Sequence, residues 1–519
     1  MPEITGRAAR PPPVNRRPVA LVVGLLALAT FALHLATNGQ YGFFRDELYF
    51  LMCGQRLDWG YVDQPPGIAL VARLATELAG MSLVGIRMPP ALVAAGLVAL
   101  SAAFAVRLGG GVFAAVLAGL SVAVAPVLSI WGHLLTMNSF QPLVWLGVAW
   151  TAFALVEGEG RGLARWVLLG VLLGVGANFK YDVAFWLAGV LGAVVLTREG
   201  RRALRWDGIG LAVLVAAVLV APNLLWQVRH GLPMLELLRN GQLRKNTPFE
   251  PGSFLLQQLL LMGPLAAPVW LLGLFSGLTR RDRPTRVLSL AFLGTLALMF
   301  VGKAKAYYLA PAYPTLLALG AVELEARIRR PVLRWATAIG VTAAGLAVLP
   351  LSIPVLPVDT LIRYQAALHF TPPRDEQHAF NPLPQHLADE FGWPGIVQAL
   401  ATASGRLSPE ERRTGAIYTF NYGEAAALEF LGRDRGLPTV VSGHNQYWVW
   451  GSRGSMLDPL LVIGGSAKGL SQDYQEVTEV GRTPVDPHAM PYESDRPIFL
   501  CRGRRTDPVA TWPEEKHFE

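Results

Sequence analysis

Residues Tyr41–Pro66 read YGFFRDELYFLMCGQRLDWGYVDQPP, and the interpretation of the whole chain starts from this stretch. It follows the first long apolar run, which extends from Val19 to Ala36. Four acids lie within it: Asp46, Glu47, Asp58 and Asp63. Carboxylates beside a membrane span are costly unless they face water or serve a function. The stretch therefore predicts a water-facing loop that carries at least one functional acid.

The composition indicates a polytopic membrane protein with some soluble mass. The 519 residues are 52% hydrophobic and only 16% charged, whereas a soluble domain has about 25% charged residues. The net charge of +8 could suggest a nucleic-acid partner. However, the arginines form short clusters between apolar runs and no nucleic-acid motif accompanies them, so membrane topology explains them better. We expect no nucleic acid among the partners.

Eleven apolar runs are expected to cross the membrane, since a crossing needs about 20 residues. They lie near 18–37, 88–106, 112–130, 140–156, 164–179, 183–197, 208–226, 256–278, 286–301, 307–324 and 332–350. With this count, every arginine cluster falls on one side, which the positive-inside rule makes cytoplasmic. Residues 1–17 are then a cytoplasmic tail and residues 18–350 a transmembrane domain. The protein is expected in the inner (plasma) membrane.

The other side carries the longer loops and a second domain. Loops 38–85, 131–138, 227–255 and 302–306 face outward, and within the first loop 47–55 and 68–79 are expected to be interfacial helices. Residues 355–519 are expected to form a soluble α/β domain with strands at 416–420, 439–442 and 497–501 and a helix at 424–431. The two cysteines, Cys53 and Cys501, suggest two free thiols, with one bridge as the alternative.

Three short motifs carry a family resemblance through their order and their common outward side. They are the pair Asp46-Glu47 after the first run, Asp63-Gln64-Pro65-Pro66, and the segment Lys303–Pro311, KAKAYYLAP. The chain resembles the protein O-mannosyltransferases and the lipid A aminoarabinose transferases, which are GT-C fold enzymes of glycosyltransferase family 39/83 type. The resemblance covers most of residues 15–350. It implies transfer of a sugar from a polyprenyl-phosphate carrier to a lipid, protein or glycan acceptor on the extracytoplasmic side, with inversion.

The resemblance also implies roles for individual residues. Asp46 falls at the base, with Glu47 beside it, and Asp63 falls where the aminoarabinose enzymes have an acid near a metal. Gln64 stands where those enzymes have a phosphate-contacting lysine, and Asn138 stands near an acid that the second outward loop often carries. The segment matched to the carrier-phosphate contact contains Lys303, Lys305, Tyr307 and Tyr308.

The chemistry needs few groups. A carboxylate must take the acceptor proton as the acceptor attacks the anomeric carbon. The phosphate is already a good leaving group and needs nearby positive charge rather than a general acid. We expect Lys303, Lys305 and Arg45 to supply that charge.

Each assignment has a simpler alternative. Asp46 could be a first-turn helix acid, and Glu47 could orient Asp46 or be solvated. The two lysines could reach lipid head groups, and the two tyrosines could be interfacial aromatics.

Further candidates lie outside these motifs. Asp63 and His230 form a weak pair of candidate ligands for a divalent ion, although the reaction requires no cofactor. In the C-terminal domain His444, Asn445 and Tyr447 belong to a polar, aromatic cluster that suits a sugar, with a loop docking the domain onto the membrane part as the alternative.

The sequence thus predicts a bacterial cell-envelope glycosyltransferase. The rivals are a lipid or sugar transporter (flippase) and a non-catalytic glycan-binding membrane protein.

Overall fold

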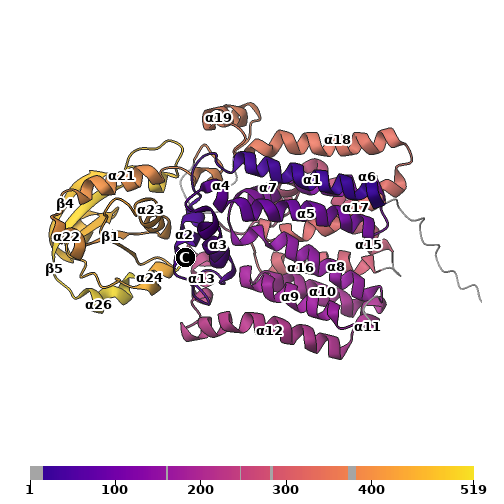
Figure 1. Cartoon of the computed structure of the whole chain (residues 1–519), viewed down its shortest axis with the longest axis horizontal. Coiled ribbons are helices and arrows are strands. Elements are labelled where there is room, and N and C mark those ends of the chain that lie inside the picture. The colour runs from indigo at the N-terminus through magenta and orange to yellow at the C-terminus, as the bar shows by residue number, and fades with distance from the viewer. Residues whose placement is uncertain (1–15, 159–161, 246, 281–283, 372–380) are drawn as a thin grey trace, which may run out of the picture.

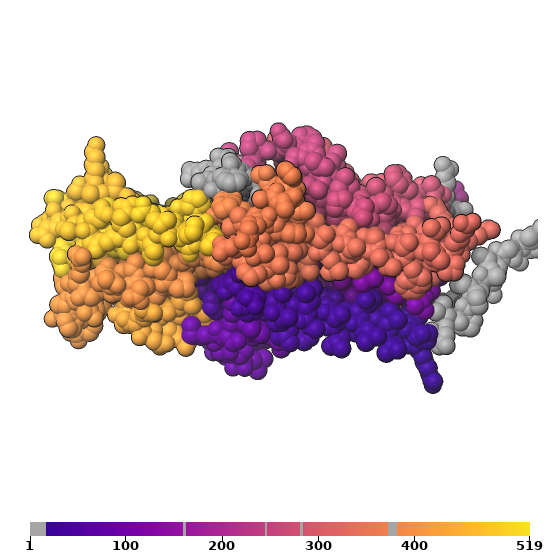
Figure 2. Space-filling view, turned by 90° about the horizontal axis from the view of Figure 1, so that it is seen from above, coloured from indigo at the N-terminus to yellow at the C-terminus, as the bar shows by residue number. Residues whose placement is uncertain are grey.

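The computed structural model describes residues 16–158, 162–245, 247–280, 284–371 and 381–519. A bundle of helices forms one part, and a smaller domain built on a β-sheet forms the other (Figure 1). The molecule is elongated, with the C-terminal domain, orange to yellow, at one end (Figure 2). Helix α1 (Arg16–Thr37) begins at the opposite end of the bundle. The expected tail 1–17 lies, except for its last two residues, outside the described residues.

The bundle is formed by the apolar runs. Among the described residues, five helices are long and apolar enough to cross a membrane, or up to seven if each of two bent pairs is one span. The five are α1, α5 (Met88–Arg107), η1 with α8 (Met137–Val156), α12 (Trp206–Arg229) and α18 with η5 (Pro331–Leu351). The bent pairs are α6 (Val112–Ala123) with α7 (Pro126–His133), at 65°, and α14 (Pro251–Met262) with η3 and α15 (Pro264–Thr279), at 90°.

Shorter helices complete the bundle. They are α9 (Ala164–Phe179), α10 (Val183–Leu196), α11 (Arg198–Ala203), α16 (Thr285–Val301), η4 (Ala306–Ala312) and α17 (Tyr313–Arg327). Each of the eleven expected runs contains one of these helices or bent pairs. Length and composition alone do not establish that every one crosses the membrane, so the count of eleven stays a prediction.

Glycines allow the closest helix contacts. A Cβ at Gly320 of α17 would lie 1.8 Å from the carbonyl oxygen of Val269, and one at Gly273 of α15 would lie 2.1 Å from that of Leu316. The two backbones therefore touch, and only a residue without a side chain fits at the crossing.

The loop after α1 folds into three short helices between the bundle and the C-terminal domain. They are α2 (Arg45–Gln55), α3 (Gly67–Ala79) and α4 (Leu83–Ile86). Residues 47–54 of α2 are all buried, so α2 does not lie in a lipid interface as expected; α23 of the C-terminal domain covers it. By contrast, α3 exposes Leu70, Leu74 and Leu78 on one face, the pattern expected of an interfacial helix.

The C-terminal domain contains a five-stranded sheet of order β2-β1-β3-β5-β4. Its strands are β1 (Ala416–Thr419), β2 (Thr439–Ser442), β3 (Leu460–Ile463), β4 (Tyr474–Arg482) and β5 (Pro497–Arg504). Strand β1 pairs in parallel with β2 and β3, and β5 runs antiparallel to β3 and β4. The three expected strands are present, whereas β3 and β4 were not predicted. Cys53 and Cys501 are buried free thiols, as expected.

Helices cover this sheet and connect it to the bundle. The connection contains α19 (Val358–Ala367), α20 (Gln385–Ala388) and α21 (Trp393–Ser404). The domain adds α22 (Pro409–Thr414), α23 (Tyr422–Leu431), α24 (Gln446–Trp450), α25 (Ala467–Leu470), η6 (Pro491–Glu493), α26 (Pro508–Thr511) and η7 (Trp512–Glu515). Helix α13 (Pro233–Asn240) contacts the end of the chain through the Asn240 amide, which donates to the Phe518 carbonyl at 2.8 Å.

Candidate functional site

Asp46 lies in the first turn of α2, where the bundle meets the C-terminal domain. Its side chain is 30% exposed. The hydroxyl of Tyr422, the first residue of α23, donates a hydrogen bond to Asp46 Oδ1 at 2.8 Å. Arg45 Nε lies 3.5 Å from the same oxygen. The carboxylate is therefore held by one oxygen and still reaches the surface.

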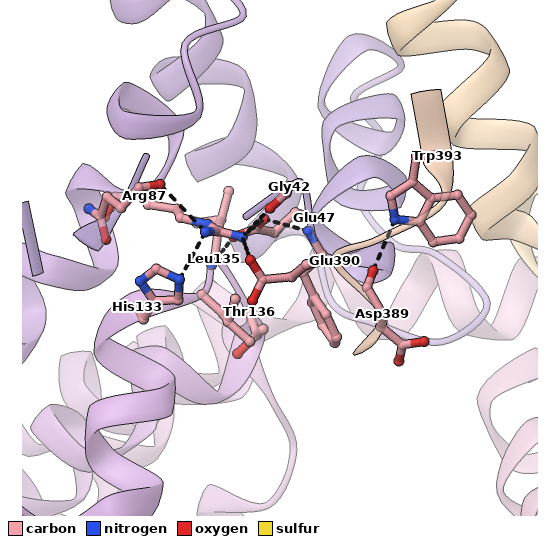
Figure 3. Close-up of polar contacts among 12 residues, drawn as sticks. Gly42, Glu47, Arg87, His133, Leu135, Thr136, Asp389, Glu390 and Trp393 are labelled. Carbon is pink, nitrogen blue, oxygen red and sulfur yellow. Dashed lines mark hydrogen bonds and ion pairs between the residues drawn. The ribbon is translucent and has the colours of Figure 1, made fainter. Parts of the chain in front are cut away.

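Glu47 has a different environment, although it is the next residue. Its side chain is completely buried, and both of its oxygens accept hydrogen bonds from the guanidinium of Arg87, at 2.9 Å each (Figure 3). The backbone N–H groups of Leu135 and Phe44 add two more, at 2.9 and 3.0 Å. This excludes a solvated Glu47. Its carboxylate binds α2 to the start of α5 and to the loop after α7.

Arg87 is the centre of this buried network. Nη2 donates to Glu390 Oε2 at 3.1 Å, and Nη1 lies 2.9 Å from His133 Nε2 (Figure 3). Burial raises the pKa of Glu390 to about 8 despite the neighbouring Arg87. The sequence analysis did not single out Arg87. It could have been noticed because it directly precedes the apolar run 88–106, at the end of that run predicted to lie away from the arginine clusters.

Arg45, expected to contact phosphate, is 11% exposed. Its guanidinium carbon lies 5.6 Å and 5.9 Å from the ring centres of Tyr422 and Tyr492. Nη1 donates to the Tyr492 hydroxyl at 2.7 Å, and Nη2 lies 3.8 Å from Asp389 Oδ2. One donor, Nη1, is used by Tyr492, whereas Nε is buried without a hydrogen-bond partner among the described residues, and the charge of Arg45 lies beside Asp46 and Asp389.

Asp63 and Gln64 follow in the same loop. The Tyr49 hydroxyl donates to Asp63 Oδ1 at 2.8 Å, and the Asn445 amide lies 3.4 Å from Oδ2. Gln64 is completely buried. Asp63 therefore links the loop to the C-terminal domain, and Gln64 does not present its amide to a phosphate in this arrangement.

Lys180 lies between α9 and α10, at a turn for which the sequence suggests either a local pair with Asp182 or a wall of the substrate chamber. Its ammonium donates to Asn138 Oδ1 at 2.6 Å and lies 3.6 Å from Asp182 Oδ2. It also lies 3.9 Å from the ring centre of Tyr308 and 5.6 Å from that of Tyr307. The loop that contains Asn138 and the segment that contains Tyr307 and Tyr308 thus both contact Lys180, whose side chain is 15% exposed. The Asn138, Tyr307 and Tyr308 predicted from separate motifs meet here.

The two lysines of the KAKAYYLAP segment lie close to this group in the chain. Lys303 follows α16 and is exposed, with a left-handed backbone at φ 53°. Lys305 is half-buried and directly precedes η4, which contains Tyr307 and Tyr308.

The cluster in the C-terminal domain is largely used for contacts within the chain. The Tyr447 hydroxyl donates to Glu429 at 2.8 Å, and Tyr447 is 1% exposed. Asn445 exchanges hydrogen bonds with the backbone of Glu519 at 3.2 and 3.1 Å, and His444 Nε2 lies 3.1 Å from the Glu519 carbonyl oxygen. These contacts lie within the C-terminal domain, whereas the Asn445 amide, 3.4 Å from Asp63 Oδ2, links the cluster to the loop after α1. A sugar site and a docking loop both stay predictions.

The candidate metal ligands have separate partners. The His230 ring stacks on Trp226 at 3.9 Å between ring centres, and Nδ1 lies 2.8 Å from the Trp226 carbonyl oxygen. Within the described ranges, no three His, Cys, Asp or Glu side chains are grouped so that they could hold a metal ion. Pairing of Asp63 with His230 stays a prediction.

Comparison with solved structures shows which fold this chain shares. Over 94% of its length the chain superimposes on 98% of the crystal structure of ArnT from Cupriavidus metallidurans bound to undecaprenyl phosphate, with a TM-score of 0.59 and 16% identity. The chain has the ArnT fold. Apo ArnT from the same organism gives a TM-score of 0.58 at 17% identity, over 93% of this chain and 97% of ArnT. The GT-C fold expected from the resemblance is therefore confirmed.

Sequence comparison covers a smaller part of the chain. Residues 63–226 match the family model described as dolichyl-phosphate-mannose-protein mannosyltransferase. The lipid A galacturonosyltransferase RgtD of Rhizobium johnstonii is 33% identical over 195 residues, which are 36% of this chain and 39% of RgtD. The chain thus aligns with about two fifths of this curated relative. The family match includes Asn138 and Lys180 but not Asp46, whose role stays a prediction.

Proposed function

We propose that the chain is an integral membrane glycosyltransferase that uses Asp46 as its general base. It transfers a hexosyl or pentosyl group from a polyprenyl-phosphate carrier to an acceptor hydroxyl on the extracytoplasmic side, with inversion. The observation that carries the proposal is the Asp46 carboxylate, partly exposed at the junction of the two parts of an ArnT-like fold, with Oδ1 held by Tyr422. Among the described residues, Oδ2 has no polar partner and is available for a proton.

The chemistry uses the groups of this junction. The acceptor oxygen attacks the anomeric carbon from the face opposite the phosphate and transfers its proton to Asp46 Oδ2. The bond between the anomeric carbon and the phosphate oxygen breaks, and its electron pair leaves with the phosphate. A carboxylate base of this kind typically contributes about a hundredfold or more. Inversion follows because the new bond forms on the opposite face.

Cations beside Tyr307 and Tyr308 suit the leaving phosphate. Lys180 lies over the Tyr308 ring, and Lys303 and Lys305 belong to the segment 303–311 that also contains Tyr307 and Tyr308. Fixed positive charge at a developing phosphate monoester stabilises the transition state. We propose Lys180 as the principal phosphate contact, with Lys303 and Lys305 supporting it.

The proposal also includes the side of the membrane on which Asp46 lies and the donor and acceptor that it serves. If eleven runs cross the inner membrane, the arginine clusters are cytoplasmic, and Asp46 and the C-terminal domain are extracytoplasmic. The ArnT crystal structure contains undecaprenyl phosphate, which supports a polyprenyl carrier. RgtD is named a lipid A galacturonosyltransferase, which makes lipid A and galacturonic acid the first acceptor and sugar to test. The proposed reaction requires no cofactor, and chelator added to the assay tests a divalent ion.

The decisive experiment compares wild type with Asp46→Asn in nanodiscs. Undecaprenyl-phosphate-linked galacturonic acid, glucose and arabinose serve as donors, with lipid A and membrane extract as acceptors. We expect wild type to transfer at least one sugar and Asp46→Asn to lose about a hundredfold or more of that rate. Asp58→Asn is the control, because it makes the same change in the same loop at a carboxylate that accepts hydrogen bonds from the Trp226 indole and the Trp59 N–H. Equal rates in wild type and Asp46→Asn would remove Asp46 from the mechanism.

A further inference from the structure

The contact between Tyr422 and Asp46 joins residues 376 positions apart. Asp46 belongs to the loop after the first span, and Tyr422 belongs to α23 of the C-terminal domain, beside α2 (Figure 1). In the described structure, Tyr422 is thus the one residue outside α2 with a polar contact to the Asp46 carboxylate.

The Tyr422 ring is held on several sides. Its centre lies 4.6 Å from that of Tyr49 and 4.8 Å from that of His444, and the Arg45 guanidinium lies 5.6 Å away. The side chain is 7% exposed. A phenol packed in this way has little rotational freedom, so its hydroxyl has a defined direction.

The backbone beside Tyr422 approaches α2 closely. A Cβ at Gly423 would lie 2.5 Å from Arg45 Cγ, which means that the first turns of α23 and α2 pack without room for another side chain. The Asn421 side chain accepts a hydrogen bond from the Glu424 N–H at 2.8 Å and so caps α23. The start of α23 is therefore fixed relative to Asp46.

The chemical state of the phenol is also defined. Burial raises the pKa of Tyr422 well above its ordinary value, and the nearby Asp46 adds to the shift. Tyr422 therefore keeps its proton at physiological pH and acts as a donor to the carboxylate.

We propose that Tyr422 is a positioning residue for the proposed general base, so that the C-terminal domain completes the reacting centre instead of only covering it. The proposal rests on the function proposed above. By engaging Oδ1, the tyrosine fixes the rotamer of Asp46 and directs Oδ2 toward the acceptor hydroxyl.

The test is Tyr422→Phe, which removes only the hydroxyl. We expect kcat to fall about tenfold, the size expected for one hydrogen bond to a charged group, with an unchanged KM for the undecaprenyl-phosphate sugar. The loss falls on kcat because the base is no longer directed at the acceptor hydroxyl, whereas binding of the donor is unaffected. A purely structural role would raise KM or lower the thermal unfolding midpoint together with kcat.

Two controls keep the outcome unambiguous. Tyr474→Phe removes a buried hydroxyl that donates to the Leu457 carbonyl at 2.8 Å, away from α2, and we expect wild-type rates. The thermal unfolding midpoint of Tyr422→Phe shows whether the variant is folded. A folded Tyr422→Phe with the kcat and KM of wild type overturns the proposal. If Asp46→Asn abolishes transfer in the same assay while Tyr422→Phe behaves as wild type, the proposed function stands and the role of Tyr422 fails.

Discussion

Arg87 and Glu47 form a bidentate ion pair, in which Nε and Nη2 of Arg87 each lie 2.9 Å from a different carboxylate oxygen of Glu47. The residues are 40 positions apart, and both side chains are completely buried. The pair fixes the first turn of α2 against the start of α5. Asp46 is next to Glu47 in that turn, so the ion pair also sets where Asp46 lies.

Arg87→Met should unfold at a much lower temperature than wild type. It leaves the Glu47 carboxylate buried without its partner, and breaking a buried pair in this way typically costs about 3–5 kcal/mol. The control is Arg73→Met, which breaks the exposed Arg73–Glu77 pair on α3 and should cost less than about 1 kcal/mol. Thermal unfolding in detergent checks both variants, and similar midpoints for the two would contradict the structural role of Arg87.

Glu390 should make the protein less stable as pH rises toward 8. Its pKa is raised from 4.5 to about 8 by burial, so between these values the folded state binds more protons than the unfolded state. The stability contributed by this group is therefore complete below about pH 4.5 and is lost as pH rises through 8.

Glu390→Gln should flatten that dependence. Unfolding midpoints measured across the same pH range provide the check, with Glu77→Gln on the exposed face of α3 as control. An unchanged pH dependence in Glu390→Gln would mean that another group causes it.

Lys180→Met should weaken use of the lipid-linked donor. The ammonium lies 3.9 Å from the centre of the Tyr308 ring, so its loss removes positive charge from the proposed phosphate position. We expect kcat/KM for an undecaprenyl-phosphate sugar to fall about tenfold to a hundredfold. Lys303→Met should have a smaller effect because Lys303 is exposed. Steady-state kinetics test this order, and a larger loss in Lys303→Met would reverse the assignment.

Much of the architecture is predictable because it depends on residues close together in the chain. A run of apolar residues predicts a membrane helix whatever its neighbours are, and all eleven runs contain helices or bent pairs. Strands β1, β2 and β5 also follow from local apolar segments. Strand β4 was missed because YQEVTEVGR is mostly exposed at the edge of the sheet and has few apolar residues.

The site could be predicted only in part. Asp46, Asp63 and Lys303–Tyr308 can be singled out because they lie in loops that the arginine pattern predicts to share one side of the membrane. The different environments of Asp46 and Glu47 could not be predicted from the sequence, because the two acids are adjacent and chemically similar. The fold separates them by burying Glu47 against Arg87 and leaving Asp46 partly exposed. The buried α2 was expected at a lipid interface for a similar reason: a half-apolar helix suits either a membrane surface or the underside of another domain.

The sequence by itself determined the class of protein, the apolar runs, the outward loops and the resemblance carried by their motifs. Tertiary structure alone decided the partners: Arg87 for Glu47, Tyr422 for Asp46, and Lys180 for Asn138 and Tyr308. The physical reason is the range of the interactions involved. Hydropathy is a sum over neighbouring residues, whereas an ion pair or hydrogen bond depends on which helix faces meet, and packing of the whole chain determines that.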